Sequence, residues 1–299
     1  MIPYPHHPTF RDGTVLLRDG RRLGYAAYGD PAAPPVLYFH GFPGCRTEPA
    51  SIPVRHVRLI AVERPGYGLS CPRDGRTFLD WPDDVAQLMD ALELDGAFVV
   101  GMSGGAPYAA ACALALGHRL SGAALLAGVA PPGHGWETGS PAGVLLSMAR
   151  RPLALRLAAT AVRRVLQHGD VSSVLAALHR LLGLPTLNGE LAKTAVGERV
   201  MLGWRQALSH GVHGPLGDAL LYGRPWGFDP GAIRIPVSVW HGSADRTVPV
   251  AAAHIYARLI PGARLHVIEG ETHFSLAHRH HQAILADLLR HAAAPARAA

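Results

Sequence analysis

Lysine is almost absent from this chain. Its basic side chains are arginines, with Lys193 as the single exception, and the formal net charge is +6 with a pI near 9.6. Proteins that bind nucleic acid gather basic residues into stretches interleaved with aromatic side chains, and the sequence contains no such stretch. The bias towards arginine, together with alanine-rich helical segments, is typical of a GC-rich genome. We therefore predict that the chain binds no nucleic acid.

Cysteine is also scarce. The three cysteines, Cys45, Cys71 and Cys112, cannot all pair, and their spacing matches no metal site. Reduced thiols are typical of cytoplasmic proteins, and the N-terminal segment lacks the basic start and apolar core of a secretory signal. No apolar run is long enough to cross a bilayer. The sequence thus predicts a cytoplasmic protein with no membrane span and no bound metal.

Charged residues make up only 17% of the 299 residues and apolar residues 48%, which is typical of a globular chain with a large core. Continuous apolar runs alternate with helical patterns. This alternation predicts an α/β fold, in which a mostly parallel central sheet is covered by helices on both faces. The predicted strands are residues 14–17, 22–29, 36–39, 57–62, 97–100, 122–129, 237–240 and 265–268. The predicted helices of this part are residues 80–94, 107–117, 250–260 and a last one that ends near 289.

The pattern changes between the sixth and seventh predicted strands. Residues 132–231 show leucine and alanine at helical spacing and no convincing strand. We interpret this region as an all-helical cap inserted into a core formed by residues 1–131 and 232–299. Its predicted helices are residues 143–151, 153–168, 171–183, 190–210 and 215–222.

A G-x-S-x-G pattern marks the junction between the strand at 97–100 and the following helix. A serine at such a sharp corner takes strained backbone angles, so the residues two positions before and after it must be nearly free of side chain. Gly101 and Gly105 meet that demand on either side of Ser103, and Pro107 suits the first turn of a helix. The pattern therefore predicts a serine hydroxyl that projects above the sheet.

A serine hydroxyl needs a base, and the base needs a group that orients it. Asp245 follows one predicted strand and His273 follows the next, so both lie at the same carboxyl edge of the sheet as Ser103. The order Ser, Asp, His is one of the known chain orders of a catalytic triad. Two alternatives stay open at this point: Asp245 as the cap of the helix that follows it, and Ser103 as the elbow serine of an inactive relative.

Five motifs occur in order along nearly the whole chain. They are His40-Gly41-Phe42-Pro43-Gly44, Arg64-Pro65-Gly66-Tyr67-Gly68-Leu69-Ser70, Gly101-Met102-Ser103-Gly104-Gly105, His241-Gly242-Ser243-Ala244-Asp245 and Gly270-Glu271-Thr272-His273-Phe274. In these residues the sequence resembles the α/β-hydrolase superfamily, and within it the capped serine esterases. One departure, Cys45 directly after the first motif, suggests a thiol close to the pocket that is sensitive to thiol reagents.

The resemblance implies a role for each residue. Ser103 attacks an acyl carbonyl, His273 accepts its proton, and Asp245 holds the imidazole and stabilises its cation. The backbone N–H groups of Phe42 and Gly104 form the oxyanion hole. A cis Phe42–Pro43 bond is expected to shape the first turn. No cofactor is implied.

The predicted function is that of a serine hydrolase which cleaves a carboxylic ester through an acyl-enzyme intermediate. Aromatic residues suggest a small to medium lipophilic substrate, and the pocket candidates are Met102, Tyr108, Trp136, Trp204, Trp226 and Phe228. Lactonase, thioesterase, and C–C bond hydrolase or lyase activities remain open on the same triad. A non-catalytic ligand receptor is the alternative outside enzymes. The small ester-like substrate is the only expected partner, and the protein is expected to be a monomer or homodimer.

Overall fold

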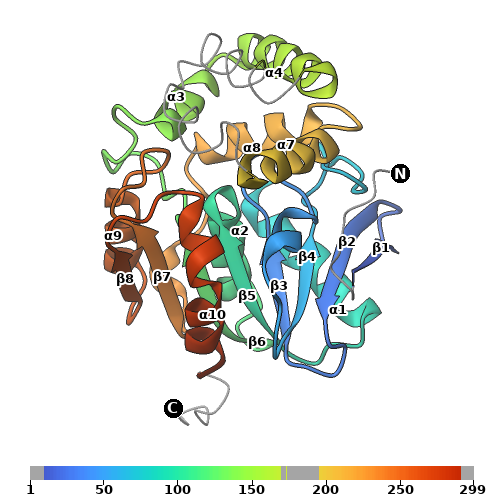
Figure 1. Cartoon of the computed structure of the whole chain (residues 1–299), viewed down its shortest axis with the longest axis vertical. Coiled ribbons are helices and arrows are strands. Elements are labelled where there is room, and N and C mark those ends of the chain that lie inside the picture. Colours follow the sequence, from blue (N-terminus) through green and yellow to red (C-terminus); the bar gives the residue numbers. More distant parts are fainter. Residues whose placement is uncertain (1–9, 170–172, 174–194, 291–299) are drawn as a thin grey trace.

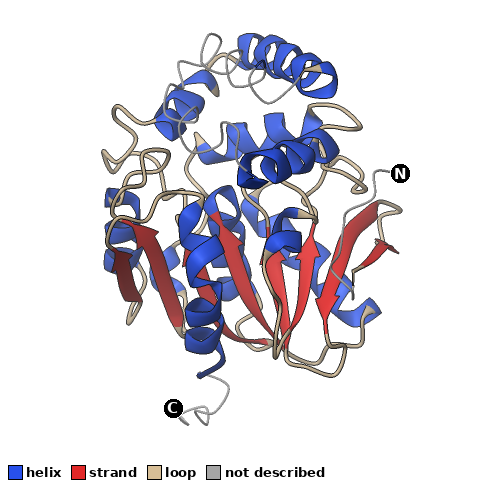
Figure 2. Cartoon of the chain, viewed as in Figure 1, coloured by secondary structure: helices blue, strands red, loops and turns tan. Residues whose placement is uncertain are grey.

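The central element of the fold is an eight-stranded sheet, seen in the computed structural model, which describes residues 10–169, 173 and 195–290 (Figures 1 and 2). The strand order is β1-β2-β4-β3-β5-β6-β7-β8. In chain order the strands are β1 (Arg11–Leu16), β2 (Arg22–Gly29), β3 (Pro35–Phe39), β4 (Arg58–Val62), β5 (Ala97–Met102), β6 (Leu120–Leu126), β7 (Val237–Gly242) and β8 (Arg264–Ile268).

The direction of the strands gathers their carboxyl ends at one edge. The hairpin β1–β2 is antiparallel, and β2 pairs antiparallel with β4. From β4 to β8 every neighbouring pair is parallel. Loops that follow β3, β5, β7 and β8 therefore meet above the middle of the sheet, which is where ligands bind in open parallel sheets.

Helices cover both faces of this sheet, as the sequence predicts. They are α1 (Trp81–Ala91), α2 (Ala106–Ala115), α9 (Ala251–Leu259) and α10 (Ser275–Leu289), with short 3-10 helices η1 (Glu48–Ser51), η2 (Phe78–Asp80), η3 (Ser103–Gly105) and η4 (Pro230–Ala232). Alternate residues of one strand face opposite cores: Leu37 belongs to the cluster that includes residues of α1, α2 and α9, whereas Val36 belongs to the cluster that includes residues of α10. The α/β fold with a mostly parallel, doubly covered sheet is confirmed.

Boundaries differ slightly from those predicted. The sixth strand ends at Leu126 and not at 129, and the backbone at Ala127 takes a positive φ of 46°. This left-handed conformation does not occur within a strand. The strand therefore ends at Leu126, where the chain turns towards the inserted region. The helix predicted at 107–117 spans Ala106–Ala115.

Between β6 and β7 the chain forms helices that lie over the carboxyl ends of the strands (Figure 1). We call them the cap helices: α3 (Pro141–Met148), α4 (Pro152–His168), α7 (Ala195–Ala207) and α8 (His213–Tyr222). In the described part of residues 132–231 the regular structure is helical. The helix predicted at 171–183 lies outside the described residues except for one position. None of the described helices is both long and apolar enough to span a membrane.

Candidate active site

Ser103 lies at the corner between β5 and α2, where its backbone takes a positive φ of 52°. The two glycines of the motif make this corner possible. A Cβ on Gly101 would lie 2.6 Å from the Gly105 carbonyl oxygen, and a Cβ on Gly105 would lie 2.8 Å from the His40 carbonyl oxygen and still closer to that of Phe39. Backbone atoms cannot move aside as a flexible side chain can. Glycine is therefore required at both positions for α2 to pack this closely against β3 and β5.

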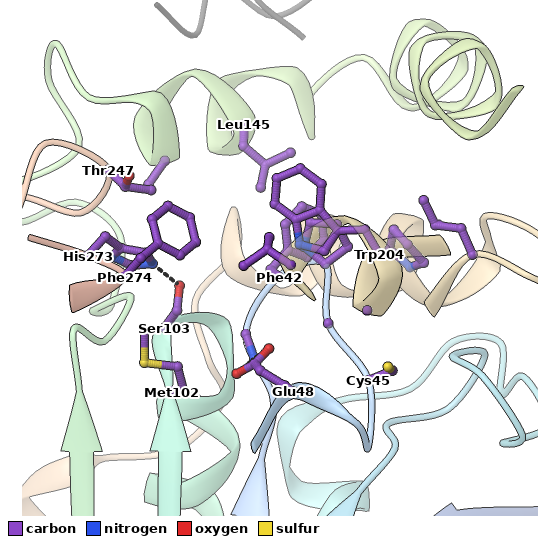
Figure 3. Close-up of a pocket in the computed structure, with 18 of the residues that line it drawn as sticks. Phe42, Cys45, Glu48, Met102, Ser103, Leu145, Trp204, Thr247, His273 and Phe274 are labelled. Atoms are coloured by element: carbon purple, nitrogen blue, oxygen red, sulfur yellow. Dashed lines mark hydrogen bonds between the residues drawn. The ribbon is translucent and has the colours of Figure 1, made fainter. Parts of the chain in front are cut away.

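The Ser103 hydroxyl contacts the imidazole of His273, which lies 170 residues further along the chain. The distance from Ser103 Oγ to His273 Nε2 is 2.9 Å (Figure 3). The loop after β8 delivers the histidine, and both residues are buried, with 7% of Ser103 and 4% of His273 exposed. A hydrogen bond of this length allows the imidazole to accept the hydroxyl proton.

Asp245 lies on the side of His273 that faces away from Ser103. Its Oδ2 lies 2.7 Å from His273 Nδ1 and 3.3 Å from His241 Nε2. Its Oδ1 accepts hydrogen bonds from the backbone N–H groups of Thr247 (2.8 Å) and Val248 (2.9 Å). Asp245 therefore caps the next turn with one oxygen and holds the imidazole with the other.

The environment keeps Asp245 ionised. Burial favours the neutral acid, but the charge of His273 and hydrogen bonds from His241 and His273 outweigh it and hold the pKa of Asp245 well below its ordinary value. A permanent carboxylate beside Nδ1 fixes the proton of the imidazole on that nitrogen. Nε2 is then free to accept a proton from Ser103.

Phe42 and Gly104, the expected oxyanion donors, lie next to each other beside Ser103. The position of a Cβ on Gly104 would be 2.9 Å from Phe42 Cβ. The Phe42–Pro43 bond is cis, as expected from the sequence. Gly41, which forms the peptide that carries the Phe42 N–H, is held on both sides: its carbonyl accepts from Arg64 Nη2 (2.9 Å), and its N–H donates to Glu48.

A buried network of charges and tyrosines connects this loop to the cap helices. Asp218 of α8 accepts hydrogen bonds from Arg64 Nε (2.8 Å) and Arg76 Nη2 (2.5 Å) of the core. Its other partners are three tyrosine hydroxyls, from Tyr67, Tyr108 and Tyr222. Tyr222 also donates to the Gly104 carbonyl at 2.8 Å. Arg64 and Asp218 are fully buried, and burial opposes the charge of Asp218, yet the two arginines hold its pKa far below the ordinary value.

An apolar cavity of about 840 Å³ opens above Ser103. It lies between the loops of the sheet edge and the cap helices, and Figure 3 shows Leu145, Trp204 and Phe274 around it. Of the expected pocket residues, Met102 and Trp204 line this cavity. Pockets with a mostly apolar lining typically bind lipophilic groups.

The structure does not bring the other four expected pocket residues to the cavity. Tyr108, Trp226 and Phe228 pack around Phe78 in an aromatic cluster of the core, and Tyr108 also donates to Asp218. Trp136 is buried, and its indole N–H donates to the Pro131 carbonyl. Aromatic side chains serve core packing as readily as ligand binding, and the sequence did not show which face each one occupies.

The expectation for Cys45 is corrected in part. Its thiol lines the cavity, but the residue is completely buried and contacts Thr47 Oγ1 at 2.9 Å. Burial, with a further contribution from the charge of Glu63, raises the pKa of Cys45 to about 12. The thiolate, which is the reactive form, is therefore scarce at neutral pH.

Sequence reasoning missed two features of the site: Glu48 at the cavity wall, and the network around Arg64 and Asp218. Arg64 belongs to a motif that the sequence displays, but its partner lies 154 residues away in the cap. An isolated Asp in a helical pattern gives no signal of such a contact. Among the described residues there is no group of three or more His, Cys, Asp or Glu arranged to hold a metal ion.

Comparison with known proteins agrees with this architecture. Residues 34–278 match the family model described as alpha/beta hydrolase fold, so the chain belongs to the alpha/beta hydrolase family. It is 30% identical over 285 residues to a non-heme chloroperoxidase of Streptomyces lividans. The aligned region covers 93% of this chain and 98% of that relative.

Two solved structures have the same fold. A hydrolase from Pseudomonas aeruginosa PA01 matches with a TM-score of 0.69 at 23% identity, over 95% of this chain and 98% of that one. The esterase RhEst1 from Rhodococcus sp. ECU1013 matches with a TM-score of 0.66 at 22% identity, over 95% and 99% of the two chains.

Proposed function

We propose that the protein is a serine hydrolase that cleaves a carboxylic ester of a small to medium lipophilic substrate through an acyl-enzyme intermediate. The observation that carries the proposal is the hydrogen-bonded line from Ser103 through His273 to Asp245 at the floor of an apolar cavity. A nucleophile, a base and an orienting carboxylate in this geometry are what acyl transfer requires.

The proposed reaction has two halves. Ser103 Oγ attacks the ester carbonyl while His273 Nε2 takes the hydroxyl proton, and the oxyanion that forms is held by the N–H groups of Phe42 and Gly104. Collapse of this intermediate expels the alcohol, which receives the proton from His273, and leaves the acyl group on Ser103. Water then attacks the acyl-enzyme with His273 as base, and the acid and free Ser103 are released.

The experiment is a panel of p-nitrophenyl esters from acetate to octanoate, run beside lactones and thioesters, on the wild type and Ser103→Ala. Turnover that rises with acyl length and is lost in Ser103→Ala supports the ester hydrolase. Turnover of lactones or thioesters but not of esters would show that the substrate belongs to that class instead. Tight binding of such compounds without any turnover would favour the receptor.

A second activity is favoured by the name of one relative, the chloroperoxidase of Streptomyces lividans. Hydrogen peroxide can replace water in the second half of the reaction, and the acyl group then leaves as a peracid while Ser103 regains its proton. Formation of peracid from p-nitrophenyl acetate and peroxide, lost in Ser103→Ala, would support this activity. Formation of acetate alone, with no peracid, in the presence of peroxide would exclude this activity.

We also propose that residues 132–231 form the inserted cap, that the protein is cytoplasmic, and that it is a monomer or homodimer. Helices α3, α4, α7 and α8 support the cap boundaries. Three free thiols suit a reducing compartment.

A further inference from the structure

Glu48 is an acidic side chain at the wall of the cavity that holds Ser103. Its Oε1 accepts a hydrogen bond from the Tyr38 hydroxyl at 2.6 Å. The N–H of Gly41 donates to both carboxylate oxygens, at 3.1 Å and 3.0 Å. Within the described part of the chain, no arginine or histidine forms an ion pair with Glu48. Burial raises the pKa of Glu48, and the hydrogen bonds from Tyr38 and Gly41 and the charges of Arg64 and His273 offset this only in part. A carboxylate kept at such a cost without an ion-pair partner is a candidate for substrate binding.

The space beside Gly41 connects this carboxylate to the nucleophile. The position that a Cβ on Gly41 would occupy lies 3.4 Å from Glu48 Oε2 and 3.6 Å from Ser103 Cβ. Both are ordinary van der Waals distances, so Glu48 Oε2 and Ser103 Cβ face the same space in front of Gly41, and a substrate group packed against Gly41 lies close to both. Because residue 41 is glycine, the position is left open by the protein itself.

Glu48 also lies on the side of Ser103 where the acyl group is expected. In Figure 3, His273 lies on one side of Ser103, and Glu48 and Phe42 lie on the other. The leaving alcohol must be next to His273, because that imidazole protonates it. The oxyanion and the acyl chain are therefore directed away from His273, which leaves Glu48 within the space that the acyl chain can reach.

The carboxylate has capacity for one more donor. Two carboxylate oxygens offer about four acceptor positions, and Oε2 receives only the hydrogen bond that it shares with Oε1 from Gly41. The rest of the wall around Ser103 is largely apolar and includes Phe42, Met102 and Phe274. A polar group on the acyl chain would find its acceptor at Glu48.

We propose that Glu48 recognises a hydrogen-bond donor, a hydroxyl or a protonated amine, on the acyl group within two carbons of the scissile carbonyl. This inference rests on the proposed ester hydrolase function and narrows its substrate class to hydroxy- or amino-acyl esters. The alternative is that Glu48 only holds the Gly41 loop in place.

The experiment compares kcat/KM for four matched pairs of acyl groups. Ethyl propionate is set against ethyl lactate and ethyl alaninate, and ethyl butyrate against ethyl 3-hydroxybutyrate and ethyl 3-aminobutyrate, with release of acid followed at constant pH. The hydroxy and amino arms distinguish the two kinds of donor. We expect the wild type to prefer at least one donor-bearing ester by about 10-fold or more, as suits a hydrogen bond to a charged group.

Two variants test the two halves of the geometry. Glu48→Gln retains an acceptor for Tyr38 and Gly41 but removes the charge, and Gly41→Ala places a methyl group in the open position. We expect either change to reduce the preference to less than about 3-fold, with the larger loss for amines in Glu48→Gln. The control is Glu198→Gln, because Glu198 is an exposed acid at the same cavity, and it should retain the wild-type preference.

The outcomes separate this inference from the proposed function. A preference that is the same in the wild type and Glu48→Gln, or absent from the wild type while ethyl butyrate is hydrolysed, overturns the role of Glu48 and leaves the ester hydrolase intact. No hydrolysis of any ester by the wild type overturns both.

Discussion

Asp245 uses its two carboxylate oxygens for different hydrogen bonds, and it does not cap the following helix, because α9 begins at Ala251 with Val250 as its N-cap. Oδ1 accepts from the backbone of Thr247 and Val248, while Oδ2 faces His273. The sequence permitted both interpretations because an aspartate after a strand and before a helix suits either. The structure shows that one oxygen holds the turn before the helix and the other faces the imidazole, which is the position that the proposed triad requires.

Asp245→Asn should therefore damage catalysis more than folding. The amide oxygen can still accept from Thr247 and Val248, but the amide N–H faces His273 Nδ1 and favours the tautomer with its proton on Nε2. That tautomer cannot accept the proton of Ser103, so we expect kcat to fall by about 10³–10⁴-fold. Ester hydrolysis and thermal unfolding of the variant measure the two effects.

The control for this substitution is Asp229→Asn. Asp229 is an exposed cap whose Oδ1 accepts from Gly231 N at 2.8 Å, so it tests the loss of a capping charge outside the site. Activity of Asp245→Asn within threefold of the control would contradict the role of Asp245.

The three cysteines should differ in reactivity. Burial raises the pKa of Cys45 to about 12 and that of Cys112 well above its ordinary value, whereas Cys71 is only half-buried. With Ellman's reagent at pH 8 we expect one rapidly reacting thiol, absent from Cys71→Ser, and two that react only in denaturant. Rapid modification of Cys45 in the folded protein would contradict this expectation.

At the scale of elements, the corner between β5 and α2 depends on close backbone approach. Gly105→Ala places a Cβ against the carbonyl oxygens of Phe39 and His40, so we expect a loss of about 3 kcal/mol or more in the free energy of unfolding, or no folding. Gly203 in α7 has nothing within 4 Å of its Cβ position, and Gly203→Ala should gain about 0.5–1 kcal/mol. Thermal melting compares them, and equal melting temperatures would be evidence against tight packing at the corner.

Asp218 links helix α8 to two arginines of the core, Arg64 and Arg76. Removing the charge of Asp218 leaves the buried guanidinium groups of Arg64 and Arg76 without a counter-charge. We therefore expect Asp218→Asn to lower the free energy of unfolding by about 3–5 kcal/mol at pH 7. Because the folded pKa of Asp218 is depressed, its contribution is complete above the unfolded pKa of about 3.9 and is lost as pH falls below that value. Urea unfolding at pH 7 and at pH 3 should show the difference between wild type and variant shrinking with acid.

Asp90→Asn provides the matched control for that experiment. Asp90 pairs with Arg119 at 2.7 Å, but 66% of its side chain is exposed, so its loss should change the free energy of unfolding by less than about 1 kcal/mol. A similar effect for both variants would show that the buried network does not anchor α8.

At the scale of the whole molecule, the sequence predicted what depends on local pattern and order. Apolar runs and glycine positions located the strands around Ser103, and the loops after β7 and β8 located Asp245 and His273. The cavity wall was not predictable in the same way. Whether Tyr108 or Trp204 faces a cavity depends on how the cap helices dock, and that is set by contacts such as Arg64 with Asp218, which no local pattern records.

The most direct test of the central claim, that His273 activates Ser103 as a nucleophile, is covalent labelling with a fluorophosphonate followed by mass spectrometry of the peptides. We predict one adduct per chain, on Ser103, with a labelling rate at least about 10³-fold lower in His273→Ala. An adduct on another residue, or labelling of Ser103 at the same rate in both proteins, would contradict the account.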